Sequence, residues 1–162
     1  MGPFSDRAAI TPSAAARPNT DPTCLVERVH GVVLSGGSVF GLAAADGVIA
    51  ALSEKGIGLP LGPRAVPVVP SAILFDLMNG GDKDWGTEAP YRTLGMQAVE
   101  ALSHDVTEGR AGAGFGARAG AKAGGIGTAS FETEDGLKVG AIVAVNSFGA
   151  VTDASDVDLG DV

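Results

Sequence analysis

Several features that mark other classes of protein are scarce in this 162-residue sequence. Cys24 is the single cysteine, so no disulfide bond can form within the chain, as is usual in a reducing cytosol. Basic residues are in the minority, 11 against 19 acidic ones, and the net charge of −8 would repel nucleic acid and anionic membrane surfaces. We therefore expect neither nucleic acid nor a membrane as a partner.

Long apolar segments are missing as well. No run approaches the roughly 20 apolar residues that a membrane-spanning helix needs. The N-terminus lacks the basic and then apolar segments of a secretory signal, and we expect a cytoplasmic location. The two histidines and one cysteine form no cluster with the spacing of a known metal site, so we expect no metal and no cofactor.

What the sequence does have is apolar residues and glycine. Hydrophobic residues make up 45% of the chain, which is enough to build one folded core at this length. Aromatic residues reach only 5%, whereas glycine occurs 25 times. This combination indicates closely packed backbone and many tight turns rather than a core of large side chains.

The chain divides into three parts by composition. Residues 1–24, rich in Ala, Pro, Ser and Thr, show neither helical nor strand periodicity and predict a loop or arm. Residues 25–150 predict a single α/β domain. Residues 151–162 form an acidic tail whose carboxylates lack the spacing of a calcium loop, and we interpret this tail as a solvated end.

The first half of the domain predicts a strand and then a helix. The run "VHGVVL" is apolar on both faces, as in a central strand. Ser38 fits the N-cap of the helix, Lys55-Gly56 fits its C-terminal stop, and one apolar face is formed by Phe40, Ala44, Val48 and Leu52. The segment "VPVVPSAILFDL" predicts two short β runs split by Pro70, as in an interrupted or edge strand.

The second half predicts a helix, a loop and a hairpin. Thr87 fits the cap of the helix and Pro90 its first turn, and apolar residues follow at helical spacing. The segment "GRAGAGFGARAGAKAGG" predicts a long loop dominated by backbone. Two β runs around Glu134-Asp135-Gly136 predict a hairpin. The order β-α-β-α-loop-β-β indicates a layered α/β or α+β domain whose sheet ends antiparallel.

Ser38 and the glycine-rich loop each allow a chemical interpretation. As a nucleophile Ser38 would need the pattern G-x-S-x-G, but Phe40 replaces the second glycine. Neither His30 nor His104 has the context of a catalytic triad, so an N-cap is the preferred interpretation of Ser38. The glycine-rich loop lacks the strand-turn-helix context and the Lys-Ser/Thr pair of phosphate-binding loops.

Asn146 and Lys122 are the stronger candidates. Asn146 ends the apolar strand "VGAIVAVN", where its amide either closes a turn or donates to a developing oxyanion, a role worth about 3 kcal/mol. Lys122 is the one lysine of the glycine-rich loop. It is either an exposed surface residue or, if backbone excludes water from it, a group for proton transfer.

Six stretches of the sequence, in this order, resemble the DmpA-like family of L-aminopeptidase/D-esterases, β-peptidyl aminopeptidases and nylon-oligomer hydrolases. They are "LVERVHGVVLSGGSVFGLAAADGV", "GIGLPLG", "VPVVPSAILFD", "EGRAGAGFGARAG", "GGIGTAS" and "VGAIVAVNSFG". The resemblance implies an αββα sandwich of the N-terminal-nucleophile type. Such a precursor cuts itself into a larger α chain and a smaller β chain, whose new N-terminal Ser or Thr is the nucleophile.

The resemblance also implies roles for four residues. Asn146 matches an active-site Asn of the family, and Lys122 lies at or next to a Lys near the nucleophile in nylon-hydrolase-like members. Phe75 stands where other members carry an active-site Tyr, so one hydroxyl donor is lost. Ser38 belongs to the tight strand-to-helix turn, which is mainly architecture and also shapes the pocket. We thus predict Asn146 and Lys122 as catalytic, and Phe75 and Ser38 as pocket residues.

Two functions stay open at this stage. We expect the fold to be incomplete at both ends and the nucleophile to lie outside this sequence. The first function is the α-chain-like part of a self-processing amide hydrolase or aminopeptidase for small peptide or amide substrates. It would be completed by a β chain or C-terminal portion and assembled as a homo-oligomer. The alternative is a non-catalytic truncated homologue or assembly subunit.

Overall fold

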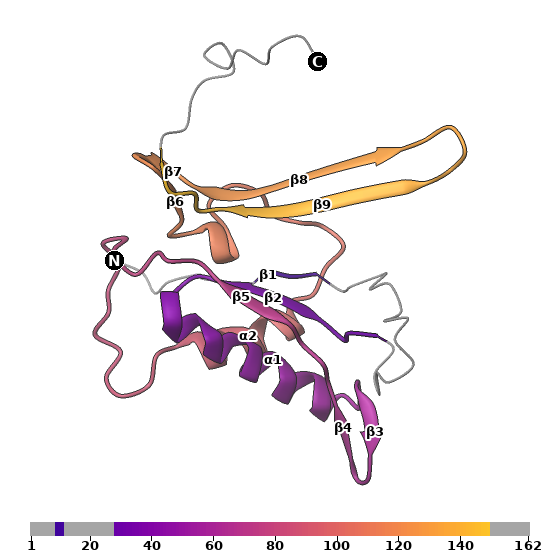
Figure 1. Cartoon of the computed structure of the whole chain (residues 1–162). Helices are drawn as coiled ribbons and strands as arrows, with labels where there is room; N and C mark the ends of the chain where they lie inside the picture. The colour runs from indigo at the N-terminus through magenta and orange to yellow at the C-terminus, as the bar shows by residue number, and fades with distance from the viewer. Residues whose placement is uncertain (1–8, 12–27, 150–162) are drawn as a thin grey trace.

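The computed structural model describes residues 9–11 and 28–149 (Figure 1). Residues 1–8 and 12–24 of the predicted arm, with Cys24, and the predicted acidic tail lie outside the described residues. Helices and strands are mixed along the chain, which confirms the α+β class. Within the described ranges, neither of the α-helices nor any 3₁₀ turn has the length and apolar character that crossing a membrane requires.

A three-stranded sheet lies at the centre of the molecule, in the order β1-β2-β5. It contains β1 (Ala9–Thr11), β2 (Val32–Ser35) and β5 (Ser71–Ile73). Strand β2 pairs antiparallel with β1 and parallel with β5. The prediction of a central apolar strand is therefore confirmed, although β1 falls inside the predicted arm. Three residues are too few to show a period, and their hydrogen-bonding partners on β2 are distant in sequence.

Two helices cover one face of this sheet (Figure 1). The 3₁₀ helix η1 (Ser38–Leu42) leads into α1 (Ala43–Glu54), which packs along α2 (Tyr91–Glu100). A Cβ at Gly47 would overlap the backbone carbonyl of Arg92 on α2. The small residues of α1 therefore let the two helices approach closely.

Both predicted helix N-caps are wrong. Ser38 is the first residue of η1, and its side chain makes no capping bond because it binds a segment distant in sequence. Helix α2 begins after Pro90 rather than at Thr87, since the residue before a proline is disfavoured in helical conformation. The predicted stop at Lys55-Gly56 is confirmed, with Gly56 at a φ of 73°.

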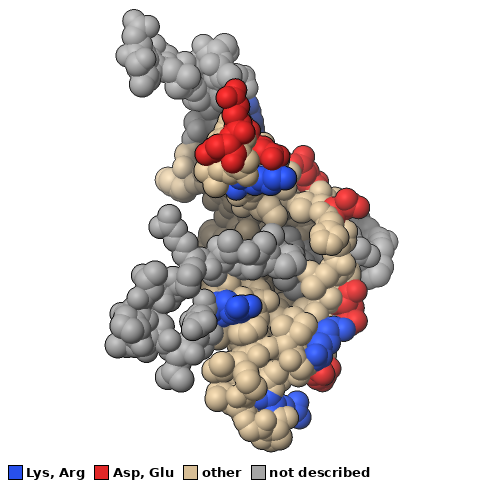
Figure 2. All heavy atoms as spheres, turned by 90° about the vertical axis from the view of Figure 1, so that its right-hand side faces the viewer, with Lys and Arg blue, Asp and Glu red and all other residues tan. Residues whose placement is uncertain are grey.

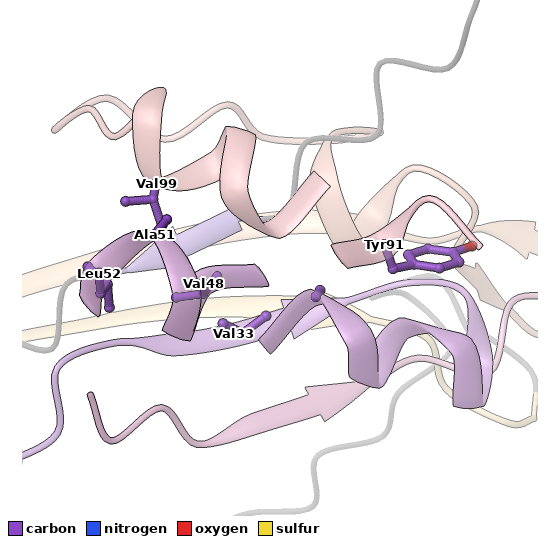
Figure 3. Packing of buried hydrophobic residues seen from close by; sticks show 7 residues of the cluster. Val33, Val48, Ala51, Leu52, Tyr91 and Val99 are labelled. Atoms are coloured by element: carbon purple, nitrogen blue, oxygen red, sulfur yellow. The ribbon is translucent and has the colours of Figure 1, made fainter. Parts of the chain in front are cut away.

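The two faces of β2 point into two hydrophobic clusters. Val33 is fully buried and packs against both helices, with Val48, Leu52 and Val99 around it (Figure 3). Leu34 points the other way and packs against the second cluster, formed by Leu74, Ala113, Ala117 and Ile126. Because side chains alternate along a strand, the sheet separates a helical layer from a second β layer.

The second β layer is the hairpin of β8 (Gly125–Glu132) and β9 (Lys138–Val145), which lies across the sheet from the helices (Figure 1). Gly136 at φ 86° in the Asp-Gly turn confirms this predicted hairpin. The glycine-rich segment before it contains the short turn η2 (Gly112–Gly114) and a hairpin of β6 (Arg118–Ala119) and β7 (Lys122–Ala123).

Of the two β runs predicted around Pro70, the second is confirmed as an edge strand, whereas residues 67–70 of the first are not in a strand. Strand β4 (Arg64–Val66) pairs with β3 (Leu59–Leu61) in a separate hairpin, and β5 resumes after Pro70 at an edge of the described sheet. The carbonyl of Pro70 accepts a hydrogen bond from the backbone N–H of Val33 at 3.0 Å. Proline can therefore stand beside the central strand as an acceptor while lacking a donor of its own.

Candidate functional site

The carboxyl ends of β2 and β5 meet at one edge of the sheet because these strands are parallel. Backbone hydrogen bonds continue beyond the strands, from Leu74 N–H to the Ser35 carbonyl at 2.9 Å and from Ser38 N–H to the Leu74 carbonyl at 3.0 Å. The turn after β2 and the segment after β5 therefore lie side by side. Such carboxyl edges are where open α/β sheets commonly bind ligands.

Ser38 occupies a strained position in this turn. Its φ of 53° is the one positive value among the non-glycine residues of the described ranges. The side chain is buried, and its Oγ accepts hydrogen bonds from the backbone N–H groups of Asp76 and Leu77, each at 3.2 Å. A hydroxyl held between two amides and shielded from solvent is placed to hold the backbone together. An attacking nucleophile needs the opposite, an exposed oxygen.

Asp76, which sequence reasoning missed, is the buried carboxylate of this edge. Its Oδ1 accepts a hydrogen bond from Gly37 N–H at 2.6 Å. Its Oδ2 would lie 2.5 Å from a Cβ at Gly36 and 2.7 Å from a Cβ at Gly116. These glycines are therefore required by close packing around a carboxylate, and the signal in the sequence was an acidic residue directly after the apolar run "SAILF".

Asn146 reaches the same place from the end of β9. Its Nδ2 donates to the Phe75 carbonyl at 3.2 Å, and its Oδ1 accepts from the Arg118 backbone N–H at 2.9 Å. A carbonyl can only accept and an N–H can only donate, so these two partners fix which way the amide faces. Ser38, Phe75 and Asn146, three of the four predicted site residues, are thus brought together by three different strands.

Phe75 and Lys122 differ in how they are held. The Phe75 ring is 73% exposed although the backbone on both sides of it is hydrogen-bonded. Lys122 lies on β7, in the small hairpin whose Arg118 contacts Asn146. That hairpin is also tied to Ser147 by a bond from Gly120 N–H at 3.2 Å. Lys122 therefore belongs to the element that holds Asn146 in place.

A cluster of aromatic rings packs between the candidate site and the helical layer. A Cβ at Gly37 would overlap the ring of Tyr91, the buried first residue of α2. Trp85 packs edge-on against Tyr91 and against Phe40, with ring centroids 6.2 and 5.7 Å apart. The turn at Gly36 and Gly37 is therefore held by two groups, the Asp76 carboxylate and the Tyr91 ring.

The chemistry available at this edge is hydrogen bonding by amide and backbone groups. Within residues 9–11 and 28–149, no three His, Cys, Asp or Glu side chains are grouped so that they could hold a metal ion. The groups at this edge include the half-buried amide of Asn146, the exposed Phe75 and, on the adjoining hairpin, the exposed Lys122. This is a set suited to binding a carbonyl group and stabilising charge on its oxygen.

Comparison with known proteins identifies the family of this chain. The model of peptidase family S58 matches residues 12–160. The chain belongs to peptidase family S58. The resemblance to the DmpA-like family is thereby confirmed.

The relatives of this S58 chain carry peptidase and hydrolase names. An uncharacterized aminopeptidase of Mycobacterium tuberculosis is 44% identical over 133 residues, which cover 82% of this chain and 38% of the relative. An uncharacterized aminopeptidase of Mycobacterium leprae is 46% identical over 138 residues, with the same coverage of both chains. A 6-aminohexanoate-oligomer endohydrolase of Kocuria is 35% identical over 92 residues, 56% of this chain and 24% of the relative. This chain thus spans well under half the length of these relatives.

Proposed function

We propose that this S58 chain is the α-chain-like part of a self-processing amide hydrolase or aminopeptidase acting on small peptide or amide substrates. The nucleophilic Ser or Thr is supplied from outside these residues by a β chain or C-terminal portion. The observation that carries the proposal is the side-chain amide of Asn146, held by two backbone partners at the edge where β2, β5 and β9 end. The names of the relatives support the same reaction class.

In this proposal Asn146 stabilises the oxyanion. An amide nitrogen carries two hydrogens, and the bond to the Phe75 carbonyl uses one of them. The other donates to the substrate carbonyl oxygen as negative charge develops on it. Lys122 takes part in proton transfer, while Phe75 and the turn at Ser38 shape the pocket. With phenylalanine in place of a tyrosine, the pocket offers substrate an apolar ring at this position.

The proposed architecture is the αββα sandwich, and the order of helices, central sheet and β8–β9 hairpin supports it. The hairpin face that points away from the core is apolar, and Phe131, Val139 and Val143 are 66%, 55% and 52% exposed on it. A lone two-stranded hairpin is marginally stable in water. Figure 2 shows acidic side chains gathered at the tip of this hairpin, and in the proposal the tip stays exposed to solvent. The completing portion instead adds its layer on the apolar face that points away from the core.

The remaining features of the proposal concern the surroundings of the enzyme. We place it in the cytoplasm as a homo-oligomer of completed units. The net charge of −8 supports substrates and partners other than nucleic acid or anionic membranes.

The isolated 162-residue chain is expected to show no hydrolysis of aminoacyl p-nitroanilides or amide oligomers, because the proposal places the nucleophile outside these residues. Adding the C-terminal part of the Mycobacterium tuberculosis relative, by co-expression, should restore turnover. Release of p-nitroaniline measures both. Turnover by the highly purified chain alone would contradict the mechanism, and absence of turnover in every completed form would favour the non-catalytic homologue.

A further inference from the structure

The peptide group between Phe75 and Asp76 joins Ser38 to Asn146. Its carbonyl accepts from Asn146 Nδ2 at 3.2 Å, and its N–H donates to Ser38 Oγ at 3.2 Å. No described peptide bond is cis, so this carbonyl and N–H point in opposite directions from one rigid plane. Any displacement of the N–H therefore moves the carbonyl that holds Asn146.

The hydrogen bonds form a continuous chain across the site. It runs from Arg118 N–H to Asn146 Oδ1, from Asn146 Nδ2 to the Phe75 carbonyl, and from Asp76 N–H to Ser38 Oγ. Each amide in such a chain accepts at its oxygen and donates at its nitrogen, so neighbouring bonds strengthen one another. Ser38 lies at the accepting end and Asn146 in the middle.

Two further contacts hold Ser38 itself. Leu77 N–H gives its Oγ a second donor at 3.2 Å, and Asp76 Oδ1 binds the N–H of the preceding Gly37 at 2.6 Å. A serine at positive φ persists only where its surroundings impose that conformation. Here the imposed conformation is the one that turns Oγ toward the Asp76 and Leu77 amides.

We propose that Ser38 is a positioning residue, which sets the orientation of the Asn146 amide through the Phe75–Asp76 peptide group. The inference rests on the proposed function of Asn146 and adds a residue to it. The buried Ser38 hydroxyl acts through this peptide group and is not the nucleophile, while the turn around it still shapes the pocket. Removal of the hydroxyl leaves the buried N–H of Asp76 and the partly buried N–H of Leu77 without this acceptor, and the peptide plane then rotates to find other partners.

Kinetics give the first test, in the chain completed by a β portion. Ser38→Ala should lower kcat about 10-fold and leave KM within about 2-fold, because orientation matters most in the transition state. Ser38→Gly removes the same oxygen but relieves the positive φ, so it provides a folded variant if the alanine chain is unstable. The matched control is Ser35→Ala, which changes a similarly buried serine at the end of β2 whose Oγ donates to the neighbouring Gly36 carbonyl at 3.0 Å. Its kcat should be unchanged.

A second readout does not need activity. In the ¹⁵N-labelled protein, the side-chain amide signals of Asn146 are identified by their loss in Asn146→Ala. Ser38→Ala and Ser38→Gly should shift them and speed their hydrogen exchange, whereas Ser35→Ala should not. Unchanged Asn146 signals in a folded Ser38 variant would overturn the positioning role. If all forms are inactive, the proposed function fails while these signals still decide the role of Ser38.

Discussion

Gly47→Ala should lower the free energy of unfolding by roughly 3 kcal/mol, an effect at the upper end for overpacking. The new Cβ would overlap the carbonyl oxygen of Arg92 and lie 3.0 Å from Met96 N, both backbone atoms of α2. Backbone cannot rotate away as a side chain can, so the helices must separate. In an ordinary helix the same change stabilises by about 1 kcal/mol, so the expected sign is reversed here.

Denaturant unfolding of the wild-type and variant proteins measures this difference. Gly127→Ala in β8 is the control, because a Cβ there meets no heavy atom within 4 Å. Equal stability of Gly47→Ala and wild type would show that the helices are not packed as closely as the structure has them. Gly95→Ala should also lower the free energy of unfolding, because its Cβ would overlap the Ala44 carbonyl and force the two helices apart.

The elements that could be predicted from the sequence are those with local signals. The β8–β9 hairpin has two β runs around an Asp-Gly turn, and the end of α1 has Lys55-Gly56. The N-cap at Ser38 failed because its hydroxyl is occupied by amides 38 and 39 residues away. A local pattern cannot show that a distant segment will compete for the same oxygen.

The candidate site depends almost entirely on such distant contacts. Asn146 and Phe75 are 71 residues apart, and Asp76 meets Gly37 across 39 residues. The resemblance to a family, not spacing, is what linked Asn146, Phe75 and Ser38 before their positions were known. Asp76 was missed because an acidic residue after a strand is usually solvated. Its burial depends on Gly36 and Gly116, which come from distant parts of the chain and pack against its carboxylate.

Asn146→Ala should lower kcat of the completed enzyme by about 10²-fold or more, because it removes the donor to the developing oxyanion. Asn146→Asp should be at least as damaging. Its carboxylate can still accept from the Arg118 N–H, but it cannot donate to the Phe75 carbonyl and it places a negative charge beside a negative oxygen. Both variants therefore lack the donor, and Asn146→Asp shows whether keeping the contact with the Arg118 N–H alone preserves any activity.

The alternative is that Asn146 only closes the end of β9. Both variants would then lower the melting temperature, because the Phe75 carbonyl loses its donor in each and the Arg118 N–H loses its acceptor in Asn146→Ala, and kcat per folded molecule would stay near the wild-type value. Ser147→Ala, one residue along on the exposed side of the same turn, is the control for general disturbance. Measuring kcat and melting temperature on the same preparations decides between the two roles. A normal kcat in folded Asn146→Ala would remove Asn146 from the catalytic machinery, and with it the reason for Ser38 to hold the Phe75–Asp76 peptide group where it does.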